Sequence, residues 1–220
     1  MKQFDELLKT IRILRSPRGC PWDRAQKVDN MKNYLLEEAY ELIDGIDRKN
    51  TKVVKEELGD IFLILIVITE MFREKDKFKL GEVLCQINKK LVSRHPHVFS
   101  SKKLKTKEEV LSHWIKDKAK KKKRKSINDR LPRSGPSLLL ANILFKEYDN
   151  LDKPKLTRRD FSELIHETEG KLKKLKRAKS KKKLLADLTL DICKIAFILG
   201  LDLEGLLRRT IRKEARNISY

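Results

Sequence analysis

The sequence is poor in the residues that interrupt helices. Its 220 residues include only 8 glycines and 6 prolines, and long stretches contain neither. Glycine and proline are the residues that a helix interior tolerates least, so their scarcity favours long helices over strands and tight turns. We therefore predict an all-α protein.

Cysteines and long apolar runs are also scarce. Cys20, Cys85 and Cys193 are scattered and odd in number, which excludes a disulfide framework and a zinc motif and indicates a reducing compartment. The longest apolar run, 61–68, is far too short to cross a bilayer. The predicted first helix, 4–15, is amphipathic and charged, without the apolar centre of a signal peptide. The sequence predicts a cytoplasmic protein with no membrane contact.

Positive charge, by contrast, is abundant. Lys and Arg number 53 against 32 Asp and Glu, a formal net charge of +21. Such a balance attracts polyanions, whether nucleic acid, anionic membrane or phosphorylated small molecules. The densest runs are 118–125, basic at seven of eight positions, and 171–183, with nine basic residues. Basic runs are usually solvated segments; their functional interpretation is a salt-sensitive contact with nucleic acid.

Two acidic clusters lie within residues 35–60. The first contains Glu37, Glu38 and Glu41, and the second contains Glu56, Glu57 and Asp60. Carboxylates three residues apart share one face of a helix. Between the clusters Gly45 weakens the first helix, residues 48–50 are polar, and Asn50 or Thr51 can cap the next helix. We predict an antiparallel helical hairpin that brings four carboxylates together.

Four carboxylates at close range repel one another, and some would protonate unless a cation lies among them. Carboxylates without Cys or His suit a hard, oxygen-seeking ion, so Mg²⁺ is the first expectation and Mn²⁺ the second. With 39% charged residues, the same spacings also arise by chance on solvated helix faces. Spacing alone leaves the metal site and the solvated face equally open.

The rest of the chain continues the helical pattern. On the predicted helix 80–94 the residues Val83, Leu84, Ile87 and Leu91 are expected to face inward. Pro96 ends this helix, and His95 and His97, on either side of it, are expected to structure a turn rather than to bind metal. The full set of predicted helices is 4–15, 28–46, 51–75, 80–94, 138–148, 161–180, 184–199 and 203–216.

Four sequence blocks occur in a characteristic order: CPWDRAQ from Cys20, LLEEAYELIDGID from Leu35, EELGDIFLI from Glu56 and KLVSRHPHVF from Lys90. With these blocks, residues 4–116 resemble the MazG family of nucleoside triphosphate pyrophosphohydrolases. The family's acidic pattern, EExxE, a spacer and ExxD, stands here as Glu37-Glu38-x-x-Glu41, fifteen residues, then Glu57-x-x-Asp60.

The resemblance implies an all-α fold with a four-helix core, usually assembled as a homodimer. It implies Mg²⁺-dependent hydrolysis of nucleoside triphosphates to nucleoside monophosphate and pyrophosphate, in sanitation or control of the nucleotide pool. The implied metal ligands are Glu38, Glu41, Glu57 and Asp60, and with Glu37 they form the catalytic set. Glu37 or Glu41 would accept a proton from water. The implied substrate contacts are Lys90 and Arg94 at the phosphates, with Trp22, Asp23 and Gln26 in the CPWDRAQ block.

The second half resembles the first in layout but departs from the acidic pattern. Thr168, Lys171 and Leu188 replace three ligands, and only Asp191 is kept. A lysine among ligands opposes a cation, so this half is not expected to bind Mg²⁺ in the family manner. We predict a MazG-like domain over 1–116, a basic linker over 117–136 and a degenerate MazG-like copy over 137–220.

Two other functions stay open at this point. The chain could be a weakly active or inactive MazG-like protein that binds nucleic acid or a protein partner through its Lys-rich segments. It could also act as a phosphohydrolase on another metabolite that contains a diphosphate. Salt dependence separates the first alternative from the enzyme, because polynucleotide binding falls steeply with added salt.

Overall fold

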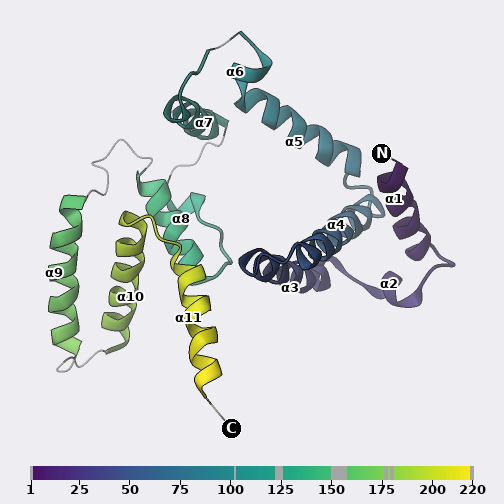
Figure 1. Cartoon of the computed structure of the whole chain (residues 1–220). Helices are drawn as coiled ribbons and strands as arrows, with labels where there is room; N and C mark the ends of the chain where they lie inside the picture. The colour runs from purple at the N-terminus through teal and green to yellow at the C-terminus, as the bar shows by residue number, and fades with distance from the viewer. Residues whose placement is uncertain are drawn as a thin grey trace. The chain divides into compact units, whose positions relative to one another are not determined.

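In the computed structural model every regular element is a helix in the part that the structure describes, residues 2–101, 103–121, 126–149, 158–175, 178 and 181–218. The prediction of an all-α protein is confirmed. The elements shown in Figure 1 are α1 (Lys2–Leu14), α2 (Pro21–Ala25), α3 (Val28–Asp47), α4 (Thr51–Arg73), α5 (Leu80–Arg94), α6 (Pro96–Phe99), α7 (Lys107–Lys121), the 3₁₀ turn η1 (Asn128–Arg130), α8 (Ser137–Asp149), α9 (Arg158–Leu175), α10 (Lys181–Ile198) and α11 (Leu203–Asn217).

The chain divides into two compact units, Met1–Leu104 and Lys105–Tyr220. Helix α7, part of which was assigned to the first domain from sequence, groups with the second unit. Half of the basic run 118–125, residues 122–125, lies outside the described residues. The predicted domain limits stay a prediction.

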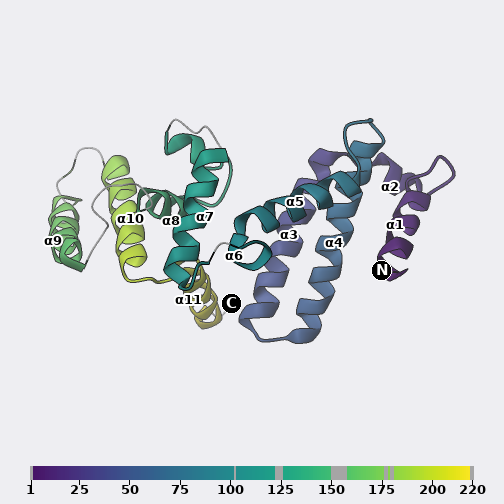
Figure 2. The ribbon, with the colours of Figure 1, turned by 90° about the horizontal axis from the view of Figure 1, so that it is seen from above.

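The first unit is built on the antiparallel pair α3 and α4, which lie side by side in Figures 1 and 2. Its core joins Met31 of α3 to Ile64 and Met71 of α4. Asn50 caps α4 as predicted: its side-chain oxygen accepts hydrogen bonds from the backbone N–H of Lys52 at 3.2 Å and of Val53 at 3.3 Å. The cap fixes the residue at which α4 begins, and the start of α4 in turn determines how α4 pairs with α3.

Gly45 has a different role from the one its sequence position indicates. Helix α3 runs through it to Asp47, so the glycine does not end the helix. A Cβ atom at Gly45 would lie 2.9 Å from Cγ1 of Val53 on α4, which is closer than such atoms approach. The absence of a side chain therefore lets α3 and α4 pack closely at the end of the hairpin.

Helix α1 is joined to α4 by buried charge. The carboxylate of Glu70 is 1% exposed and accepts hydrogen bonds from Arg12 Nε at 3.0 Å and Arg12 Nη2 at 3.2 Å, with Arg73 as a second partner. Burial alone would raise the pKa of Glu70, but the bonds from Arg12 and Arg73 outweigh it and lower that pKa. Loss of either arginine would leave the buried carboxylate with a single cationic partner, which destabilises the fold.

Helix α5 contradicts the expectation for its apolar face. Val83, Leu84, Ile87 and Leu91 are 39–48% exposed in the single chain, so their predicted inward position is wrong. The main contacts of α5 are with α4 and the short α6, which leaves this face uncovered. Leu58, Phe62 and Leu65 of α4 are also exposed. The periodicity identified an apolar face correctly, but the single chain does not bury it.

The second unit packs α10 against α9 and α8, with α11 on α8. Its core joins Ala141 and Phe145 of α8 to Cys193 of α10. Helices α9 and α10 form a second helical pair, seen side by side in Figures 1 and 2. All three cysteines of the chain are free thiols. Among the helices that the structure describes, none combines the length and apolar content needed to cross a membrane.

Candidate functional site

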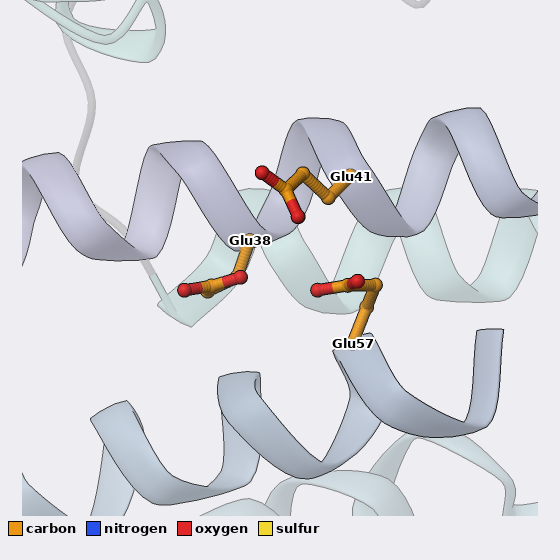
Figure 3. Close-up of side chains that lie close together, drawn as sticks. All are labelled: Glu38, Glu41 and Glu57. Atoms are coloured by element: carbon orange, nitrogen blue, oxygen red, sulfur yellow. The ribbon is translucent and has the colours of Figure 1, made fainter. Parts of the chain in front are cut away.

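Three predicted ligands meet between α3 and α4. Glu38 and Glu41 extend from α3 and Glu57 from α4, and one carboxylate oxygen of each lies within 4.8 Å of the other two (Figure 3). Glu57 is only 7% exposed although it is charged, and Glu38 is half-buried. The predicted hairpin thus places three carboxylates around one point, which a solvated helix face would not require.

The charges of this cluster oppose one another. The pKa of Glu38 is raised to about 7 by burial, by a hydrogen bond with Glu57 and by the charges of Asp60, Glu41 and Glu57. The pKa of Glu41 is also raised, first by the charge of Glu57 and then by burial. Without a cation the cluster therefore holds a proton near neutral pH. A cation that replaced this proton would relieve the repulsion among the acids.

The donor set fits a hard divalent cation. All three groups are carboxylates, the ligand type that suits Mg²⁺ and Mn²⁺. In the part of the chain that the structure describes, no lysine or arginine forms an ion pair with these three carboxylates. The residues present fit the predicted metal.

A cavity of about 170 Å³ opens beside the cluster. Glu38 and Asp60 form its acidic side, and Trp22, Asp23 and Gln26 line it from the segment around α2. The remaining lining residues are Met31, Tyr34, Leu63, Ile64 and Val67. The cavity joins the CPWDRAQ block to two of the acids, although 11 or more residues separate the block from them in the chain. Its acidic and apolar sides suit a ligand with a charged and a ring-like part.

The other predicted acids take different positions. Asp60 lines the cavity and raises the pKa of Glu38, but it is not among the three groups that meet within 4.8 Å. Glu37 is exposed on α3 and contributes through its charge to the raised pKa of Glu41. Neither position excludes the role that the family resemblance implies for these residues.

Lys90 and Arg94 lie one turn apart on α5 and are not among the residues that line the cavity. His95 Nδ1 lies 2.7 Å from the carbonyl oxygen of Leu91, at the end of the same helix. The imidazole therefore bonds to backbone at the turn before Pro96, in line with the structural role predicted for it.

Sequence reasoning missed the apolar and aromatic lining of the cavity. Tyr34 stands four residues before Glu38 on α3, so the helical period alone would have placed it on the same face. Leu63, Ile64 and Val67 belong to an apolar run in which several faces of the helix read alike. For these residues no local signal distinguishes the cavity face from the core.

Comparison with known proteins identifies the family to which this site belongs. The MazG nucleotide pyrophosphohydrolase domain matches residues 26–99. The nucleoside triphosphate pyrophosphohydrolase/pyrophosphatase MazG of Thermotoga maritima is 34% identical over 213 residues, which are 96% of this chain and 82% of the relative. The nucleoside triphosphate pyrophosphohydrolase of Escherichia coli (strain K12) is 36% identical over 155 residues, 69% of this chain and 59% of the relative. The matched domain contains all five acids of the predicted catalytic set.

Proposed function

The chain belongs to the MazG family of nucleotide pyrophosphohydrolases, and on that basis we propose that it hydrolyses nucleoside triphosphates to the nucleoside monophosphate and pyrophosphate. Water cleaves the anhydride bond between the α and β phosphates. The observation that carries the proposal is the meeting of Glu38, Glu41 and Glu57 beside a cavity lined by the CPWDRAQ block. Removal of triphosphates in this way would sanitise or control the nucleotide pool.

The acids of the hairpin would hold the metal. Glu38, Glu41 and Glu57 have the right donors and spacing, and Asp60 is the fourth ligand that the family resemblance implies. When bound, Mg²⁺ or Mn²⁺ would neutralise phosphate charge and orient the attacking water. The proton of that water would pass to Glu37, or to Glu41 where Glu38, Glu57 and Asp60 alone hold the metal.

The substrate contacts divide between two elements. Trp22 presents an exposed ring, 60% accessible, against which a base can stack, and Asp23 and Gln26 offer polar groups for its edge. Lys90 and Arg94 are assigned to the phosphates because their charge and their spacing of one helical turn suit phosphate oxygens.

A homodimer is part of the proposal. The uncovered apolar residues of α4 and α5, such as Phe62, Leu65, Ile87 and Leu91, form the kind of surface that associates with another protein surface. A second copy of this chain would offer the same surface and bury both. The cytoplasmic location stays a prediction, and the free cysteines fit it.

The test is pyrophosphate release from a panel of NTPs and dNTPs, with Mg²⁺ and with chelator, for the wild type and Glu41→Gln. We expect release that requires the metal and that the substitution abolishes, because glutamine keeps the shape of the side chain and removes its charge. Release that survives Glu41→Gln would refute the assigned site. No release from any nucleotide by folded protein would refute the enzyme and favour the binding function.

That second function has its own observation. The second unit, residues 105–220, contains 32 of the 53 Lys and Arg but 16 of the 32 Asp and Glu, so it carries +16 of the net charge of +21. A polynucleotide bound there would be released by salt, whereas hydrolysis at the α3–α4 hairpin would respond to Mg²⁺.

A further inference from the structure

The cavity is lined on one side by a segment that cannot hold its own conformation. Trp22, Asp23 and Gln26 lie in or beside α2, a helix of only five residues. Helices this short are unstable alone, because nucleation costs more than one turn of hydrogen bonds returns. Cys20 does not cap the start of α2 with its side chain, and the Gln26 side chain donates only a long hydrogen bond, 3.4 Å, to the carbonyl oxygen of Trp22. The position of the segment therefore depends on contacts with the rest of the unit.

Arg15 provides such a contact. Its Nε and Nη2 atoms donate to the two carboxylate oxygens of Glu74, at 2.8 and 2.7 Å, just beyond the end of α4. Its Nη1 atom donates to the backbone carbonyl oxygen of Asp23 at 2.6 Å. The Arg15 side chain is only 8% exposed. One guanidinium group thus joins the end of α1, the end of α4 and the segment that lines the cavity.

We propose that Arg15 is a positioning residue for the substrate: it holds the Trp22–Gln26 segment at the cavity without touching the substrate itself. The bidentate pair with Glu74 fixes the plane of the guanidinium, and the fixed plane aims Nη1 at the Asp23 carbonyl. Lysine in place of Arg15 would offer a single nitrogen in place of the planar fork, so it could not keep the bidentate pair with Glu74 and the bond to the carbonyl in their present geometry. This role rests on the proposed function, since it assumes that the cavity holds the nucleotide.

The neighbouring ion pair supplies a matched control. Arg12 lies one turn earlier on α1 and bonds to Glu70 of α4 through Nε and Nη2. It joins the same two helices, but both of its hydrogen bonds go to Glu70 rather than to α2. A substitution at Arg12 therefore weakens the attachment of α1 to α4, while the contact between Arg15 and Asp23 stays in place.

The first test needs no nucleotide. Amide hydrogen exchange would be measured over residues 20–26 in the wild type, Arg15→Lys and Arg12→Lys. Two backbone bonds report on this segment, from Arg24 N to Cys20 O at 3.1 Å and from Gln26 N to Asp23 O at 3.4 Å. We expect exchange there to rise about tenfold in Arg15→Lys and to change little in Arg12→Lys. Unchanged exchange in Arg15→Lys, or an equal rise in both variants, would overturn the proposal.

The second test is kinetic. We expect Arg15→Lys to raise KM for the nucleoside triphosphate about tenfold with kcat within about twofold, because the segment orients substrate and the carboxylates stay in place. Calorimetric Mg²⁺ affinity should not change, and Arg12→Lys should lower thermal stability and keep KM. A fall in kcat at unchanged KM would contradict a positioning role. Glu74→Gln keeps the bond between Arg15 and Asp23 and should therefore raise KM less than Arg15→Lys does. It replaces Arg15→Lys in this test if that variant does not fold.

The two proposals fail separately. If the wild type releases no pyrophosphate, the proposed function is wrong, while hydrogen exchange still decides whether Arg15 holds the segment. If the wild type hydrolyses nucleotides and neither exchange nor KM responds to Arg15→Lys, the enzyme stands and the positioning role is refuted.

Discussion

The two helical hairpins of the chain differ in what lies next to their acidic residues. Between α3 and α4, Glu38, Glu41 and Glu57 meet within 4.8 Å, and burial, a hydrogen bond with Glu57 and the charges of the neighbouring acids raise the pKa of Glu38 to about 7. Between α9 and α10, Lys171 Nζ donates to Asp191 Oδ2 at 2.6 Å. Among the residues that the structure describes, no lysine or arginine pairs with the acids of the first hairpin, whereas the second hairpin supplies a positive charge of its own. Buried acids require a cation, and a metal or a lysine can supply it.

The residues around Lys171 complete the contrast. The pKa of Lys171 is raised by its bond to Asp191 and further by the charges of Asp191, Glu167 and Asp187. Leu188 is buried in the core, and Thr168 donates its hydroxyl hydrogen to the carbonyl oxygen of Leu164 at 2.7 Å. Both therefore serve packing and local bonding, as expected of a copy that has lost its ligands. That the second unit is such a copy stays our proposal.

The largest difference between the two hairpins is expected in pyrophosphate release, when Asp60 of the first and Asp191 of the second are each replaced by asparagine. Asp60→Asn should lower pyrophosphate release about a hundredfold or more, since loss of even an outer partner of a metal site costs 10–100-fold. Asp191→Asn should leave the rate within about twofold, because Asp191 bonds to Lys171 in the second unit and is not part of the carboxylate cluster. Steady-state rates with Mg²⁺, taken well below the unfolding temperature of each variant, provide the measurement.

Equal losses of activity in Asp60→Asn and Asp191→Asn would mean that the second hairpin takes part in catalysis. Circular dichroism of both variants would control for unfolding, which matters because Asp191 is buried and its amide would face Lys171.

The second difference concerns pH. A pKa near 7 means that folded, metal-free protein holds a proton on Glu38 that the unfolded chain, with its usual value of 4.5, releases. Glu38 therefore destabilises the metal-free fold as pH rises from about 4.5 to 7. Mg²⁺ must displace this proton, so its affinity should rise about tenfold per pH unit below about 7 and level off above it.

Calorimetric titration of Mg²⁺ between pH 5.5 and 8.5, in roughly half-unit steps, would measure this dependence. The second hairpin should not contribute, because the pKa of Lys171 is raised above the ordinary 10.5 and the ammonium stays charged throughout. An affinity that does not vary with pH would contradict the protonated cluster.

Much of the first hairpin could be predicted from sequence because its signals are local. Helix limits follow from periodicity and from the Asn50 cap, and the meeting of Glu38 with Glu57 follows once two helices fold back on each other. The prediction that Lys171 would exclude metal also needed only its charge. The sequence could not identify the partner of Lys171, because its pairing with Asp191 depends on how α9 and α10 pack.

The failures come from non-local packing. The apolar face of α5 was expected inside, but periodicity states only that a face is apolar and not whether the same chain covers it. Gly45 was expected only to weaken the first helix, and its structural role is to permit the close approach of Val53 from another helix. Nothing in the sequence indicated the role of Arg15, because its partners, Glu74 and the carbonyl of Asp23, lie on two other elements.

The smallest effect is expected on the stability of the second hairpin, when the charge of Lys171 is removed. Lys171→Met keeps the length of the side chain and removes its charge, which leaves buried Asp191 without its partner. Urea unfolding of the second unit should lose about 1–3 kcal/mol, below the value for a fully buried pair because Lys171 is partly exposed. Lys173→Met, on the exposed face of the same helix, should change stability by less than about 0.5 kcal/mol.

A further substitution at Asp191 separates charge from packing in this hairpin. If Lys171 acts as the cation for Asp191, then Lys171→Met combined with Asp191→Leu should recover most of the lost stability, because no buried charge remains. Addition of Mg²⁺ to Lys171→Met should recover little, since Thr168 and Leu188 offer no carboxylate. Full recovery by Mg²⁺ would show that one lysine alone keeps this hairpin from binding metal, and the two hairpins would then differ by a single charge.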